Sequence, residues 1–148
     1  MKSPNQNGFT LIELLVAILL IGVLSYLGLT SFWVYRSDAA YSVAQEVMYN
    51  SRVTVAAGEN ADSPPPATSF VQTVQGPITD GNGKLYMPGM ELPQEVKLTA
   101  QYDPTCVDSS CQSDFLEVRH CLSAEYIQWV RFGDDVETEL DNLPGGGC

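Results

Sequence analysis

The chain has 148 residues and is acidic, with 7 Lys and Arg against 18 Asp and Glu and a formal net charge of −11. This length suits one modest domain with an attached element. The sequence has no basic run, which argues against nucleic-acid binding, because neutralising phosphates needs clusters of Lys and Arg.

Residues 1–8 form a short polar segment, and a long apolar run follows it. From Leu14 to Tyr35 there is no charged side chain. At 1.5 Å per residue a helix of that length spans about 33 Å, enough to cross a bilayer core of about 30 Å. Glu13, near the start of the apolar run, is unexpected in such a helix. Placing a carboxylate in lipid costs about 2.5–3.5 kcal/mol at mid-membrane and less near an edge. We therefore expect a membrane-spanning helix, with Trp33 and Tyr35 as interfacial anchors at its end.

The helical pattern continues beyond Arg36 but becomes one-sided. Apolar residues recur with the i, i+3, i+4, i+7 spacing of an amphipathic helix at Ala40, Val43, Ala44 and Val47. No proline interrupts the stretch from Phe9 to Ala57. The pattern predicts one helix of about 45 to 50 residues with Gly58 as its stop.

The remaining residues, 58–148, have the patterns of turns and strands. Ser63–Pro66 breaks the helix, Thr79–Lys84 is a turn signal, and Asp141–Cys148 is predicted as a loop. The strongest strand is Val96–Tyr102, where apolar and polar residues alternate. Further predicted strands are Phe115–Cys121 and Tyr126–Phe132, with weaker candidates at Val71–Val74 and Lys84–Met87. The sequence thus predicts an α+β fold, in which a small antiparallel sheet covers the amphipathic half of the helix and the apolar half protrudes.

Three interpretations compete for the N-terminus. A secretory signal has an apolar core of about 7–15 residues followed by a small-residue cleavage site, and this run is too long and lacks such a site. A plain membrane anchor explains the length but neither Glu13 nor the Gly8-Phe9 junction. The stretch GFTLIELLVAILLIGVL is similar to the class III signal of type IV pilins and pseudopilins. That signal has a polar leader ending in glycine, then Phe, then an apolar run with Glu as the fifth mature residue, which Gly8, Phe9 and Glu13 match.

The resemblance implies a processing and assembly route in a bacterium. A prepilin peptidase would cut between Gly8 and Phe9, and the new Phe9 amine would be methylated. The subunit would wait in the lipid bilayer of the inner membrane with its globular domain outside. An assembly platform would then build a helical filament of identical or related subunits, in which Glu13 pairs with the Phe9 ammonium of a neighbour.

The resemblance also implies a pilin fold with four parts. These are a cleaved leader (1–8), a transmembrane and filament-core helix (9–35), its amphipathic continuation (36–57) and a globular β domain (58–148). The function implied is a major or minor pilin of a surface type IV pilus, which supports adhesion, motility or DNA uptake. Many major pilins have a proline where this chain has Thr30. Gly28 lies two residues earlier, and a glycine weakens a helix by roughly 1 kcal/mol relative to alanine. The missing proline keeps a minor pilin or a pseudopilin open.

Two alternatives to a pilus subunit stay open. The first is a pseudopilin of a type II secretion system, which would form a short periplasmic filament. The second comes from another class of protein, a single-span membrane-anchored binding domain whose N-terminus is never cut.

The four cysteines all lie in the last third of the chain, at Cys106, Cys111, Cys121 and Cys148. An even count behind a membrane or export signal indicates two disulfides in an oxidising compartment, and as zinc ligands these cysteines with His120 would be an irregular set. Of the three connectivities we favour Cys106–Cys111, a tight loop, and Cys121–Cys148, which ties a Gly-rich tail to a strand. The second pair resembles, in position, the disulfide-bounded C-terminal region of many type IV pilins.

No arrangement of residues indicates catalysis, and the protein is not expected to be an enzyme. The acidic stretch Gly133–Asn142 offers the oxygen ligands that calcium prefers, and some secretion pseudopilins bind calcium near the C-terminus. The spacing matches no calcium-loop signature, however, and charge runs are usually solvated. Asp80–Lys84 is better explained as a turn and His120 as a structural residue. We therefore expect no metal and no cofactor.

Overall fold

The computed structural model describes residues 8–133 and 136–148 and divides the chain into two compact units, Met1–Tyr35 and Arg36–Cys148. Helix α1 (Leu11–Glu59) begins in the first unit and ends in the second. The other elements belong to the second unit. They are β1 (Thr68–Gln72), β2 (Gly76–Pro77), α2 (Gly81–Tyr86), β3 (Glu91–Leu92), β4 (Val96–Tyr102), β5 (Gln112–His120), β6 (Glu125–Phe132) and β7 (Val136–Pro144).

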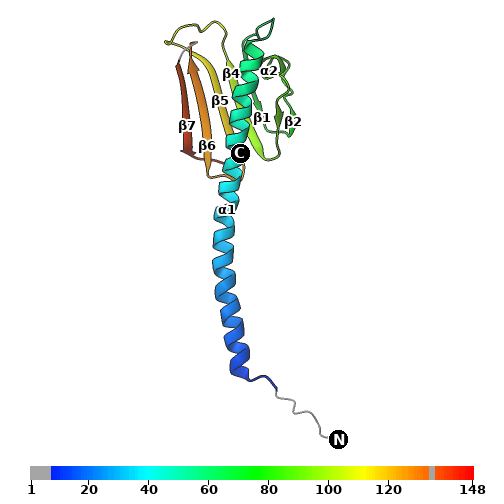
Figure 1. The fold of residues 1–148 in the computed structure, drawn as a ribbon, viewed down its shortest axis with the longest axis vertical. Coiled ribbons are helices and arrows are strands. Elements are labelled where there is room, and N and C mark those ends of the chain that lie inside the picture. Colours follow the sequence, from blue (N-terminus) through cyan, green and yellow to red (C-terminus); the bar gives the residue numbers. More distant parts are fainter. Residues whose placement is uncertain (1–7, 134–135) are drawn as a thin grey trace. The chain divides into compact units, whose positions relative to one another are not determined.

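The C-terminal part of α1 packs on a five-stranded antiparallel sheet (Figure 1). The strand order is β1-β4-β5-β6-β7, and β2 and β3 form a separate two-stranded sheet. Every pair in the large sheet is antiparallel, so the predicted α+β arrangement is confirmed. Cross-strand neighbours on one face form the core, because opposite residues in paired strands point to the same side. They include Leu98 opposite Val118, and Leu116 opposite Trp129.

Helix α1 buries one stripe of its second half against this face. The buried residues follow helical spacing, with intervals of three or four positions apart from the adjacent Val47 and Met48. They are Ala40, Ala44, Val47, Met48, Ser51, Val55 and Gly58. Gly58 was predicted only as a stop, and it has a packing role as well. A Cβ there would lie 2.3 Å from the backbone oxygen of Tyr86, so α1 can approach α2 this closely only with glycine at this position.

Two local predictions are wrong. Lys84–Met87 was a candidate strand and Thr79–Lys84 a turn, but residues 81–86 form helix α2. Asp80 caps α2, since its Oδ1 accepts a hydrogen bond from the Gly83 N–H at 2.6 Å. The predicted C-terminal loop is shorter than expected, because β7 runs to Pro144 and pairs with β6.

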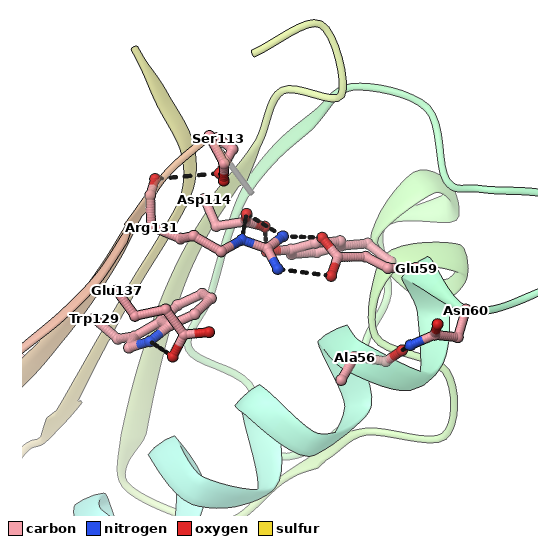
Figure 2. Close-up of polar contacts among 10 residues, drawn as sticks. Ala56, Glu59, Asn60, Ser113, Asp114, Trp129, Arg131 and Glu137 are labelled. Carbon is pink, nitrogen blue, oxygen red and sulfur yellow. Dashed lines mark hydrogen bonds and ion pairs between the residues drawn. The ribbon is translucent and has the colours of Figure 1, made fainter. Parts of the chain in front are cut away.

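The strongest polar contacts of the second unit converge on Arg131 (Figure 2). Its guanidinium donates from Nε to Asp114 Oδ2 at 2.7 Å and makes a two-pronged contact with Glu59, including Nη1 to Oε2 at 2.9 Å. Tyr86 donates its hydroxyl to Asp114, whose side chain is completely buried. The network therefore joins the end of α1, α2, β5 and β6.

Burial and charge both act on the ionisation of this network. Burial alone would lower the pKa of Arg131, but its hydrogen bonds to Glu59 and the nearby Asp114 charge raise that pKa above its ordinary value. Burial, followed by the Asp114 charge, raises the pKa of the Tyr86 hydroxyl. Arg131 stays a cation and Tyr86 stays a neutral donor across physiological pH.

A second arginine, Arg52 on α1, makes a comparable but exposed contact. It reaches Glu137 at 2.8 Å and Glu139 at 2.6 Å, both on β7. All three side chains are more than a third exposed. Solvent screens such pairs, so they contribute much less than a buried pair.

Two disulfides close the second unit, Cys106–Cys111 and Cys121–Cys148. The second holds the C-terminal tail beside the β5–β6 turn, where Gly146 donates its N–H to the Ala124 carbonyl at 2.8 Å. Arg119 adds a hydrogen bond to the Gly145 carbonyl at 2.7 Å. The tail is thus fixed by one covalent bond and two hydrogen bonds.

Arg131 and Arg52 give a matched test of whether the buried ion pairs stabilise the second unit more than the exposed ones. Arg131→Leu should lower the free energy of unfolding by about 3–5 kcal/mol, because it leaves the buried Asp114 carboxylate unpaired. Arg52→Leu should cost about 1 kcal/mol or less. Chemical denaturation of the detergent-solubilised chain, followed by near-UV circular dichroism, measures both. A larger loss for Arg52→Leu would contradict the assignment.

The two disulfides should differ in their contribution to stability. Replacing Cys121 and Cys148 together by serine frees the longer loop and should cost about 3–4 kcal/mol, whereas the same change at Cys106 and Cys111 should cost about 2 kcal/mol by the chain-entropy model. Denaturant midpoints of the two double variants give the comparison, and the reverse order would show that loop length does not govern the effect.

Candidate functional site

The Gly8-Phe9 junction lies immediately before α1. Gly8, Phe9 and Thr10 have no regular secondary structure, and the Phe9 side chain is 89% exposed. A Cβ added at Gly8 would meet nothing within 4 Å. The packing of the folded chain therefore does not itself require glycine at this position.

Glu13 forms hydrogen bonds with Thr10, the residue immediately before α1. Its Oε2 accepts hydrogen bonds from the Thr10 N–H at 3.0 Å and from the Thr10 hydroxyl at 2.9 Å. The Glu13 N–H donates back to the Thr10 hydroxyl at 3.3 Å. Thr10 and Glu13 thus form a capping box, in which the residue before a helix and its third residue satisfy each other's backbone donors.

Thr10 was missed by the sequence reasoning, although its signal was present. The letters T-L-I-E match the S/T-x-x-E/Q spacing of a capping box before an apolar run. The N-terminal motif drew attention to Glu13 alone. The structure shows that this carboxylate already has a structural role in the single chain.

The capping box uses only part of the capacity of the Glu13 carboxylate to accept hydrogen bonds. Both hydrogen bonds from Thr10 go to Oε2, while an ionised carboxylate has about four acceptor positions. Within the described residues no hydrogen bond or ion pair joins Glu13 to Phe9. Oε1 accepts no hydrogen bond from the described residues.

Helix α1 is the one helix in the described part of the chain that is long and apolar enough to cross a membrane, judged by length and composition. Its most apolar window has a mean hydropathy of 2.4 and none of that window is buried. Two hydroxyl side chains in the second part of the apolar segment bond back to the helix itself. Thr30 and Ser31 both donate to the Leu27 carbonyl, at 3.0 and 3.1 Å, so they place no unpaired hydroxyl in the apolar segment.

Three of the candidate calcium ligands, Glu137, Glu139 and Asp80, are engaged in other contacts. Asp134 and Asp135 lie outside the described residues. Glu137 and Glu139 pair with Arg52, and Asp80 caps α2. Across residues 8–133 and 136–148 no group of three or more His, Cys, Asp or Glu side chains is placed to hold a metal ion.

His120 is buried at the end of β5, where its Nδ1 accepts from the Leu122 N–H at 3.2 Å. Burial lowers the pKa of this imidazole, partly opposed by the Glu95 charge. An accepting, neutral ring fits a structural role. The four cysteines are joined in two disulfides, which occupy their thiols.

Comparisons with known proteins place the N-terminal features in one motif. Residues 3–25 match the model of the prokaryotic N-terminal methylation motif. A search of the curated proteins and a search of the solved structures each found no significant match. The matched segment includes Gly8, Phe9, Thr10 and Glu13. The chain therefore carries the class III signal peptide of type IV pilins and pseudopilins, which supports a structural subunit of one of these two kinds.

Proposed function

We propose that the chain is a pilin, a structural subunit of a type IV pilus that assembles from the inner membrane through the first half of α1. The observation that carries the proposal is the matched motif at residues 3–25, followed without a break by a membrane-length apolar helix. The motif points to a structural subunit and away from an enzyme. A filament subunit also needs an exposed apolar helix, and this one has it.

In this proposal a prepilin peptidase removes residues 1–8 on the cytoplasmic side and Phe9 becomes the methylated N-terminus. Residues 9–35 stay on the mature protein, first in lipid and then in the core of the filament. The leader carries Lys2, so its loss makes the side chains one charge more negative. The same cut creates a cationic amine at Phe9, which is the only charge the processing adds near Glu13.

Glu13 and the Phe9 amine of a neighbour would then pair. A carboxylate withdrawn from water needs a counter-charge or several hydrogen bonds, and the capping box supplies two bonds and leaves Oε1. Opposite charges a few Å apart in an apolar surrounding attract strongly. Because the contact joins the start of one helix to the side of another, it is head to tail and builds an open filament.

A pseudopilin of a type II secretion system is the second candidate, favoured by the absence of proline at Thr30. The disulfide-bounded C-terminal region, in which Cys148 and the 145–148 tail are anchored beside β5 and β6, favours the pilus. An uncut membrane-anchored binding domain is the third candidate, and it leaves the methylation motif without a role.

Two substitutions at Glu13 separate capping from charge. Glu13→Gln keeps an oxygen that can accept from Thr10, as capping boxes with glutamine do, but removes the negative charge. Glu13→Leu removes both. We expect both variants to insert in the membrane and to form no filaments by electron microscopy. Glu46→Gln, at an exposed position of the amphipathic half, is the control and should assemble normally.

The outcome for Glu13→Gln decides the mechanism. Filaments of normal number and length from this variant would show that the capping oxygen suffices and that no charge pair is needed. Filaments absent from the wild-type chain in a pilus-competent host would remove the pilus proposal itself.

A further inference from the structure

A groove of about 330 Å³ lies in the second unit between α1 and the small β2–β3 sheet. Its lining includes three buried apolar side chains, Val47, Met90 and Leu92, and two exposed carboxylates, Glu46 on α1 and Glu91 on β3. Among the described residues neither carboxylate takes part in an ion pair. This β3 groove therefore suits an occupant that has both an apolar part and a positive charge.

Helix α2 presents such a pair of side chains. Lys84 and Leu85 are adjacent and exposed, Leu85 to 57%. Within residues 8–133 and 136–148 Lys84 forms no ion pair, whereas Arg52, Arg119 and Arg131 each bind carboxylates. On a chain with 7 basic and 18 acidic residues, such a cation is scarce. We call Lys84 and Leu85 the α2 knob.

The β3 groove and the α2 knob belong to different parts of the second unit. A Cβ built at Gly58 would lie 2.8 Å from the Leu85 carbonyl oxygen, so the knob is level with the end of α1. Val47 in the groove is 11 residues earlier, which is about 16 Å along the helix. A contact between two copies through these surfaces joins unlike patches. It is therefore heterologous and continues from copy to copy as an open chain.

We propose that the β3 groove of one copy of this chain receives the α2 knob of a second copy. Leu85 covers the apolar floor, and the Lys84 ammonium lies between Glu46 and Glu91. The inference rests on the proposed function, because a filament brings identical domains side by side. Exposed charge pairs add little affinity, but complementary charges select the partner and the register. The contact thus sets how neighbouring domains are oriented, while the apolar helix supplies the main attraction.

Reversing one charge tests the contact. Lys84→Glu places a third carboxylate beside Glu46 and Glu91, and like charges across an interface are strongly disfavoured. The filament yield, counted by electron microscopy, should fall by about tenfold or more, with membrane insertion and the mature N-terminus unchanged. Lys97→Glu is the matched control. It makes the same change in net charge on β4, where the residues on either side, 96 and 98, face the core, and it should keep the wild-type yield. An equal loss from this control would show that net charge and not docking decides.

A charge swap between two copies identifies the occupant. The double variant Glu46→Lys with Glu91→Lys should also fail alone, because Lys84 then meets two lysines. Produced together with the Lys84→Glu chain, each knob meets a groove of opposite charge, and the yield should exceed that of either variant alone by about tenfold. A mixture no better than its components would mean that something other than a second copy covers the groove. Glu46→Gln leaves Glu91 to bind Lys84 and should assemble normally.

The apolar part of the contact has its own test, which does not change the charge of α2. Leu85→Ser should lower the filament yield, whereas Val74→Ser, at a side chain that is 69% exposed elsewhere on the domain, should not. Near-UV circular dichroism shows whether each variant keeps its fold. Normal filaments from Leu85→Ser and Lys84→Glu, with none from Glu13→Gln, would overturn the docking and leave the pilin assignment standing. An uncut wild-type N-terminus would overturn both.

Discussion

The structure of the first unit depends on how one carboxylate in an apolar helix is satisfied. Glu13 cannot remain ionised away from water without partners. Its first partner is local: Thr10 donates its N–H and its hydroxyl to Oε2 and thereby also caps the helix. The described residues provide no hydrogen bond to Oε1, and no other charged side chain lies between Leu11 and Tyr35. Under the proposed function, the second partner of this carboxylate is the Phe9 amine of a neighbouring subunit.

The second unit has the opposite character, since its buried charged groups find their partners within the unit. Arg131 brings together Glu59 and Asp114, and Tyr86 completes the buried carboxylate. The tail is covalently tied through Cys148. Such a unit needs no neighbour to pair its buried charges, which fits the proposed role of a domain carried outside the membrane. With a net charge of −11, copies of the chain repel one another, so the proposed assembly relies on the apolar helix for attraction.

The parts of the fold that depend on local periodicity were predictable. Strand β4 has the bounds expected from its alternation, Val96–Tyr102, and α1 runs from Leu11 to Glu59 as one helix, with a length in the expected range. The prediction of a strand from sequence pattern was wrong where a short-range hydrogen bond determines the conformation. The residues Lys84 to Tyr86 are strand-like by composition, yet Asp80 caps a helix there.

Contacts between residues far apart in the chain could not be predicted from local periodicity. Nothing in the local sequence around Arg131 indicates that Glu59, 72 positions away, will bind it. The network depends on the packing of α1 across the sheet, which only the whole fold determines. Thr10 is a different case, because its spacing to Glu13 is a recognisable capping signal. The motif at Gly8, Phe9 and Glu13 needed no structure, since it is contiguous and specific.

The claim that joins these features is that the chain is cut between Gly8 and Phe9, which creates the amine that Glu13 binds. Mass spectrometry of the N-terminal peptide from protein made in a cell with a prepilin peptidase tests it most directly. The account predicts a peptide that begins at Phe9 and carries a methyl group on its amine. A peptide that retains Met1, or one that begins near Ser31 after removal of the apolar helix, would contradict it.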